Sequence, residues 1–206
     1  KKRGKCRDSF YINANQIKVE GRRIKLPNIG WIRMSQELRF QGRPLSVVIS
    51  RTAGKFFASI QVELDETYVY PHVCESQASV GVDLGVKDLA ILSTGEKFTN
   101  PKVLRYYERK LKRLQRQLSR KEKGSKNRAK ARFLLSKLHY RIRNIRQDYI
   151  HKLTSYLVEN FLLIGIEDLN TSGMLKNHKL AKSIADASFF EIKRQLVYKS
   201  LLSGSH

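Results

Sequence analysis

The stretch that decides the fold is Val80-Gly81-Val82-Asp83-Leu84-Gly85, a short apolar strand that carries a single carboxylate. A second apolar run follows from Leu89 to Leu92, and Ser93-Thr94-Gly95 makes a turn into Lys97-Phe98. Short apolar runs that are separated by turn residues indicate strands. We therefore expect consecutive antiparallel strands here, at the start of an α/β domain.

Residues 101–160 are expected to be helical, because their apolar side chains recur at alternating spacings of three and four. The segment Lys123-Gly124-Ser125-Lys126-Asn127 separates two such series. Two helices around this Gly-Ser turn predict an antiparallel hairpin whose apolar stripes pack against each other. The apolar positions are Leu104, Tyr107, Leu111, Leu114 and Leu118, then Leu134, Leu138, Ile142, Ile145, Tyr149 and Leu153.

A continuous apolar run, Phe161-Leu162-Leu163-Ile164-Gly165-Ile166, follows the hairpin and ends in Glu167. Such a run is typical of a strand that is buried on both faces. The helical crossover should make this strand parallel to the one that carries Asp83. If the two strands are neighbours, Asp83 and Glu167 converge on one edge of the sheet. Two carboxylates in that position could hold Mg²⁺ for phosphodiester hydrolysis.

Each acid also has a purely structural interpretation, and two strand acids are by themselves a weak signal of catalysis. Asp83 could form a turn before Gly85 or pair with Lys87. Glu167 could be a strand-end carboxylate in water or a helix cap. The pattern of residues does not choose between these alternatives and a metal site.

The remaining acids and histidines are weaker candidates. Asp168 should face away from Glu167, because successive side chains of a strand point to opposite faces. Asp88 and Asp186 have less to support them than either strand acid. The five histidines show no metal-ligand spacing, and His178 is expected to be an ordinary surface residue in a polar linker.

The N-terminal part, residues 1–78, is expected to be a β domain. Two pairs of extended runs surround the turn segments Glu20-Gly21 and Thr52-Ala53-Gly54, and their apolar residues suit a small barrel or sandwich. Trp31 and Phe40 either plug this barrel or stack on bases, and we expect them to plug it. The runs are Phe10–Val19, Arg23–Leu26, Leu45–Arg51 and Lys55–Leu64.

Residues 79–206 are expected to form the second domain, with the helical hairpin at 101–160. After the second strand acid, a polar linker at Thr171–Lys182 precedes a last helix that runs from about Asp186 or Ala187 to Leu201. The inner side of this helix should carry Phe189, Ile192, Leu196 and Val197.

The charge of the chain points to a polyanionic partner. Forty-one Lys and Arg against 18 Asp and Glu give a net charge of +23 at pH 7. Nucleic acid is the expected partner, because each neutralised phosphate releases counterions; an anionic membrane surface or a merely basic protein are the alternatives. From Lys102 to Arg146 there are 18 Lys and Arg and only two acids, Glu108 and Glu122. We expect the hairpin to contact phosphates through Arg105, Arg109, Lys112, Arg113, Arg116, Arg120, Lys126, Arg128, Lys130 and Arg141.

Cys6 and Cys74 lie far apart and neither belongs to a CxxC pair, which excludes a disulfide framework and a self-contained cysteine zinc site within this stretch. Reduced thiols in a cytoplasmic protein fit best. No apolar run of about 18 residues indicates a membrane span, and no leader pattern is visible. The abrupt start at Lys1-Lys2-Arg3 suggests a fragment.

Several motifs, in order, resemble the TnpB (OrfB-type) transposon-encoded proteins, which are relatives of the type V CRISPR effectors. Gly81–Lys87 (GVDLGVK) and Ile166–Asn170 (IEDLN) flank a long basic helical insertion. Ser183–Leu196 looks like the helix that follows in that family. Lys25–Met34 and Val48–Gly54 are similar to its earlier part. The resemblance covers nearly the whole chain.

This resemblance implies an α+β protein with an N-terminal wedge-like (OB-like) β-barrel and an RNase H/RuvC-like domain, of which the chain is a part. The implied function is RNA-guided DNA cleavage for a transposon, with guide RNA and target DNA as partners. Asp83 and Glu167 would be catalytic and would hold Mg²⁺ or Mn²⁺. The family pattern continues with a cysteine-rich zinc finger and a third catalytic Asp, and neither is present here. Structural Zn²⁺ is therefore expected only in a segment absent from this sequence.

Two other functions remain as alternatives. One is an RNA-guided DNA-binding repressor that has lost cleavage, since two carboxylates without the third should hold metal poorly. The other is a plain RNA-binding protein of the ribosomal sort, which charge alone supports and which leaves both strand acids unexplained.

Overall fold

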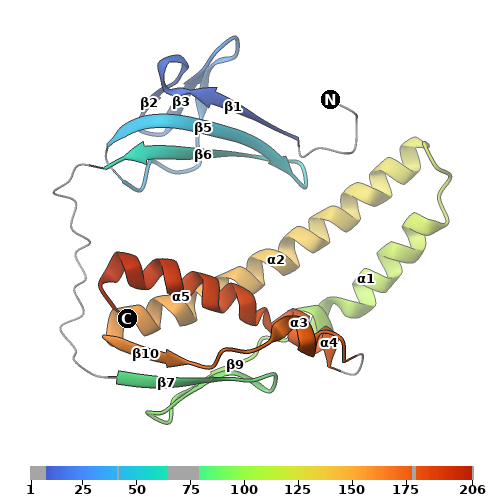
Figure 1. Cartoon of the computed structure of the whole chain (residues 1–206). Coiled ribbons are helices and arrows are strands. Elements are labelled where there is room, and N and C mark those ends of the chain that lie inside the picture. The colour runs from blue at the N-terminus through green and yellow to red at the C-terminus, as the bar shows by residue number, and fades with distance from the viewer. Residues whose placement is uncertain (1–7, 41, 65–78, 178–179, 206) are drawn as a thin grey trace. The chain divides into compact units, whose positions relative to one another are not determined.

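A computed structural model of the chain describes residues 8–40, 42–64, 79–177 and 180–205 (Figure 1). The chain divides into two compact units, residues 1–69 and 70–206. The predicted domain boundary after residue 78 falls at the end of the segment 65–78, which lies outside the described residues, so it stays a prediction. Cys6, Cys74 and His178 lie outside the described residues as well.

The N-terminal unit contains two three-stranded sheets with the orders β1-β5-β6 and β2-β3-β4. All neighbouring strands are antiparallel, and both predicted hairpins form. The predicted extended run Phe10–Val19 is interrupted by a 3-10 turn, Ala14–Gln16. The strands are β1 Ser9–Asn13, β2 Lys18–Glu20, β3 Arg23–Leu26, β4 Gly30–Arg33, β5 Arg43–Thr52 and β6 Lys55–Glu63.

Among the described residues of this unit, the strands do not close into a barrel, so the predicted barrel is not confirmed. Trp31 does not plug a core either, because 42% of it is exposed. It pairs across the sheet with exposed Lys25, one position along from buried Ile24, and therefore lies on the open face. The small core of the unit consists of Ile12, Ile17, Ile24, Leu26, Val47 and Ile49.

The C-terminal unit is built on a four-stranded sheet with the order β10-β7-β8-β9. The strands are β7 Ser79–Leu84, β8 Asp88–Leu92, β9 Lys97–Thr99 and β10 Leu163–Ile166. The antiparallel pairs β7–β8 and β8–β9 are confirmed, and so is the parallel pair β10–β7. Among the strands of the described residues, the one expected to be buried on both faces is instead at the edge of this sheet, and Leu163 is 55% exposed.

The predicted helical hairpin is confirmed as α1 Val103–Ser119 and α2 Lys126–Asn160. Buried Leu111 on α1 and Leu138 and Ile142 on α2 lie in one apolar cluster between the helices. The Ser125 hydroxyl caps α2 by accepting a hydrogen bond from the Arg128 backbone N–H at 3.1 Å. The local pattern therefore determines both helices and the turn between them.

The described residues after β10 form three helices: α3 Thr171–Met174, α4 Ala181–Ala187 and α5 Phe189–Ser203. The last helix that we expect from about Asp186 or Ala187 is present as α5, which begins at Phe189 and is separate from α4. Ser188 adopts a left-handed conformation (φ 56°), which a continuous α-helix does not permit. The inner side of α5 carries Phe189, Ile192 and Leu196 as predicted, but Val197 is 56% exposed.

The two faces of the β10-β7-β8-β9 sheet differ, and this difference positions the candidate site. One face packs on α2, α4 and α5, and contributes buried Val80, Val82, Leu84 and Leu92 to the largest core. At the α2–α5 contact, fully buried Gln195 accepts a hydrogen bond from the Thr154 hydroxyl at 3.0 Å.

No helix of the described residues has the length and apolar character required to traverse a bilayer.

Candidate functional site

Asp83 lies on the open face of the sheet. Exposed and buried residues alternate along β7, so that Val80, Val82 and Leu84 face the core. Gly81 and Asp83 face the other way and are exposed. This alternation follows from the two-residue period of a strand. The Asp83 carboxylate is therefore turned toward solvent at the far end of β7.

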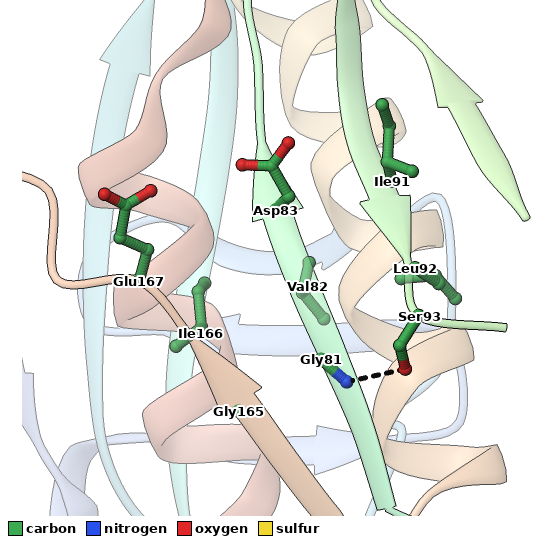
Figure 2. A pocket seen from close by; sticks show the side chains of 9 residues that line it. All are labelled: Gly81, Val82, Asp83, Ile91, Leu92, Ser93, Gly165, Ile166 and Glu167. Atoms are coloured by element: carbon green, nitrogen blue, oxygen red, sulfur yellow. Dashed lines mark hydrogen bonds between the residues drawn. The ribbon is translucent and has the colours of Figure 1, made fainter. Parts of the chain in front are cut away.

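Glu167 is brought beside Asp83 by the parallel register of β10 and β7. Gly165 is aligned with Gly81, and Ile166 with Val82. Glu167 is the residue directly after the end of β10, and it continues this alignment toward Asp83. Figure 2 shows both carboxylates at the same level on neighbouring chain segments, directed toward the same side of the sheet. Two acids 84 positions apart in the sequence thus share one face.

A hollow of about 640 Å³ lies over these acids (Figure 2). Gly81 and Gly165 form part of its floor, so no side chain rises there between the strands. On β8 and just after it, Ile91 and Ser93 line the other side, and the Ser93 hydroxyl accepts a hydrogen bond from the Gly81 N–H at 3.0 Å. The open floor leaves space for another molecule to approach the two carboxylates.

The geometry excludes several of the purely structural roles considered for Asp83 and Glu167. Asp83 is aligned with Ile91 inside the β7–β8 ladder, so it does not form a turn. Within the described part of the chain, no ion pair joins Asp83 to Lys87. Glu167 is not a helix cap, because Asn170 caps α3 by accepting a hydrogen bond from the Gly173 N–H. Its exposure still agrees with a strand-end carboxylate in water.

Asp168 lies beyond the end of β10 and does not join the pair. Its carboxylate accepts a hydrogen bond from the Lys193 ammonium of α5 at 2.6 Å, and its side chain is 85% exposed. Asp88 begins β8 and is half-buried. Neither residue lines the hollow that Asp83 and Glu167 share.

Asp186 is buried, and the sequence pattern gave no indication of its role. Its two carboxylate oxygens accept hydrogen bonds from the Leu104 N–H, at 3.1 and 2.9 Å, in the first turn of α1. The Arg146 guanidinium on α2 donates to it at 2.9 Å. Asp186 therefore ties α4 to the start of α1 and to α2. The available signal was a single acid in 181–187, where the other residues apart from Lys182 are small or apolar.

The donor set at the open face suits a hard cation but is small. Carboxylate oxygens are ligands that Mg²⁺ prefers, and Mg²⁺ is often held by one or two carboxylates while it keeps several waters. Asp83 and Glu167 supply two such groups. Among the described residues, no cluster of three or more His, Cys, Asp or Glu side chains could hold a metal ion. Asp83 and Glu167 therefore fit a water-rich Mg²⁺ site rather than a closed cage.

The predicted phosphate-binding residues of the hairpin are exposed, with one exception. Arg128 is half-buried, and its guanidinium donates to the backbone carbonyls of Leu118 and Lys121, which closes the turn between α1 and α2. Lys112 is paired with Glu108 at 2.9 Å. The other eight project into solvent: Arg105, Arg109, Arg113, Arg116, Arg120, Lys126, Lys130 and Arg141.

Comparison with known proteins connects this chain to mobile genetic elements. Residues 59–178 match the model of the family OrfB_IS605, described as "Probable transposase". A relative from Escherichia coli (strain K12), "Putative RNA-guided DNA endonuclease InsQ", is 39% identical over 221 residues, which cover 99% of this chain and 54% of the relative. A "Putative RNA-guided DNA endonuclease" from Streptomyces pristinaespiralis is 43% identical over 174 residues, or 84% of this chain and 42% of the relative. The chain spans about half the length of the curated relatives it matches.

Proposed function

This chain belongs to the OrfB_IS605 family of transposon-encoded proteins, the TnpB family, and on that premise we propose that it is part of an RNA-guided DNA endonuclease. Asp83 and Glu167 hold Mg²⁺ or Mn²⁺ in this proposal and position it for phosphodiester hydrolysis. The observation that carries the proposal is the parallel register of β10 and β7, which aligns the two acids over a glycine floor.

The proposed chemistry uses few groups of this chain. Bound Mg²⁺ supplies charge neutralisation at the phosphate and lowers the pKa of a coordinated water. Asp83 within β7 and Glu167 directly after β10 would hold the cation, and the sheet limits the movement of both side chains. Gly81 and Gly165 leave the floor open, so that the scissile phosphate can approach the carboxylates. A two-metal arrangement requires a further acid, which the proposal assigns to a segment outside this sequence.

We also propose that the sheet is part of an RNase H/RuvC-like domain and that the N-terminal unit is part of a wedge-like domain. Three antiparallel strands, β7, β8 and β9, followed by a helical crossover to the parallel strand β10, support the first assignment. The β content and the two sheets of the N-terminal unit support the second.

Guide RNA and target DNA are the proposed partners. In RNA-guided recognition, base pairing reads the sequence, while the protein holds the heteroduplex through its shape and backbone. The net charge of +23 and the exposed cations of the hairpin suit that role. The names of the two relatives support the same partners.

The test separates metal binding from cleavage. Asp83→Asn and Glu167→Gln are expected to weaken Mn²⁺ binding in titration calorimetry. In the protein expressed from its complete reading frame, with guide RNA and Mg²⁺, they should slow cutting of matched DNA by about a hundredfold or more. Asp168→Asn is the matched control, because it removes a neighbouring exposed carboxylate that does not line the hollow. Uncut matched DNA with the unmodified protein would refute the nuclease.

A nuclease-inactive, RNA-guided repressor is the second candidate. It is favoured by the presence of only two converging carboxylates among the described residues. This alternative predicts guide-dependent binding of matched DNA in gel shifts, without nicking. The binding would be unchanged by Asp83→Ala, whereas a nuclease would lose cutting through the same change.

A further inference from the structure

A second cavity, of about 530 Å³, lies beyond the end of β7, the strand that carries Asp83. Three segments that are distant in sequence line it. Lys87 comes from the β7–β8 turn, Lys102 and Arg105 come from the start of α1, and Lys182 comes from α4. Its basic lining is therefore a product of the tertiary fold and not of one charged run.

The walls of this cavity are fixed by hydrogen bonds. The Asn100 side chain donates to the Val86 carbonyl at 2.9 Å and accepts from the Lys102 N–H at 3.0 Å, which joins the β7–β8 turn to the start of α1. Asp186 binds the Leu104 N–H from the α4 side. Lys87 and Lys102 thus project from backbone segments that the fold holds in place.

The two acids that line the cavity are already neutralised. Asp186 is paired with Arg146. Glu108 is paired with Lys182 and, at 2.9 Å, with Lys112. The hydrogen bond from Lys182, followed by that from Lys112, lowers the pKa of Glu108 to about 2, so this carboxylate stays ionised and committed to its lysines.

Three further cations line the same cavity. Within the described part of the chain, neither Lys87, Lys102 nor Arg105 forms an ion pair, and all three are exposed. Ser183 adds a hydroxyl to the lining. A group of unpaired cations beside a hydroxyl fits an anion with several oxygens, such as a phosphate.

We propose that this cavity binds a backbone phosphodiester of a nucleic-acid strand, a few nucleotides from the phosphate that lies at Asp83 and Glu167. The placement of this phosphate relative to Asp83 and Glu167 rests on the proposed function. Lys87 follows Asp83 by four positions, so the two backbones are at most about 14 Å apart. A strand carries a phosphate every ~3.4 Å along a duplex axis, so a few nucleotides cover this span.

The first experiment measures the salt dependence of binding of a short single-stranded DNA in the absence of divalent cations. Lys87→Gln combined with Lys102→Gln is expected to weaken binding and to flatten the plot of log affinity against log salt by about 0.7 for one lost phosphate contact. The matched control is Lys97→Gln combined with Lys176→Gln, which removes the same charge from exposed sites that neither line the cavity nor belong to the helical hairpin. Equal effects of the two double variants would overturn the proposal.

A second variant tests the cavity with the opposite sign. Glu108→Gln releases Lys182 and Lys112 from their acid, so the affinity should rise and the salt dependence should steepen. A decrease in affinity, with the fold retained by circular dichroism, would contradict the proposed site. Neither measurement requires cleavage. If the protein fails to cut DNA but both binding effects are found, the proposed nuclease activity is refuted and the phosphate site stands. If the protein cuts DNA but neither binding effect is found, only the proposed phosphate site is refuted.

Discussion

Gly85 controls the turn that follows Asp83, because it has almost no space around its α-carbon. A Cβ atom at this position would lie 2.8 Å from the backbone carbonyl oxygen of Asp88, and a backbone atom cannot move aside as a side chain can. The Gly85 N–H also donates a hydrogen bond to the Leu89 carbonyl, at 3.4 Å. Glycine is therefore required here by close packing of two backbone segments.

We predict that Gly85→Ala destabilises the protein by about 1–3 kcal/mol, the usual cost of forcing an extra carbon into a packed site. Urea unfolding checks this value. Gly165→Ala is the control, since the nearest atom to its Cβ would be the Val80 carbonyl oxygen at 3.7 Å, an ordinary contact. That variant should change stability by less than about 1 kcal/mol. Equal stabilities of the two variants would show that the turn can relax.

Asp186 shows how differently two acids of one domain can be used. Asp83 is exposed and makes none of the ion pairs found among the described residues, whereas Asp186 is 8% exposed and accepts hydrogen bonds from the Leu104 N–H and Arg146. A buried carboxylate needs such partners, because its desolvation is costly. The Asp186 carboxylate is thus used to hold the fold together, whereas the exposed Asp83 carboxylate is accessible to a ligand.

At the scale of elements, α1 is divided into an apolar face and a basic face. Leu111 is buried against α2, while Arg109, Arg113, Arg116 and Arg120 recur at spacings of four, three and four and are exposed. Residues at these spacings lie on one side of a helix. The four guanidinium groups therefore form a continuous basic stripe that no acid of α1 interrupts.

We predict that replacing Arg109, Arg113, Arg116 and Arg120 by Gln weakens nucleic-acid binding. Each lost phosphate contact should flatten the salt dependence by about 0.9 for a duplex. The same four positions changed to Lys keep the charge and should keep most of the slope. The measurement is a binding titration across a salt series. Unchanged affinity of the Gln variant at every salt concentration would refute the assignment of this stripe to phosphates.

At the scale of the whole molecule, the net charge of +23 lowers the stability of the protein when no nucleic acid is bound. Like charges repel in the compact state, and added salt screens this repulsion with a Debye length of about 10 Å at 0.1 M. We therefore predict that the melting temperature rises with salt. A gain of ~1 kcal/mol corresponds to roughly 2–4 °C for a chain of this size. Thermal melting in a NaCl series, with sucrose as the uncharged comparison, checks it. A melting temperature that falls with NaCl would contradict the prediction.

The sequence by itself determined the elements whose signals are local. The three-and-four spacing of leucines predicted α1 and α2, and the Gly-Ser turn between them, because helix formation depends on neighbours within four residues. The β5–β6 hairpin and the antiparallel pair β7–β8 followed from short apolar runs and turn residues. The ordered motifs around Asp83 and Glu167 also identified the family, since motifs are read directly from the chain.

Only the tertiary structure decided which surfaces are covered and which distant residues meet. The apolar run at 161–166 predicted burial on both faces, yet β10 is an edge strand among the described residues. The prediction was wrong because the hydrophobicity of a strand does not determine how many strands pair with it. Asp83 and Glu167 share a face through the β10–β7 register, and Asp186 reaches Leu104 across 82 positions. Local sequence reports the preference of each residue, whereas such contacts depend on how the whole chain packs.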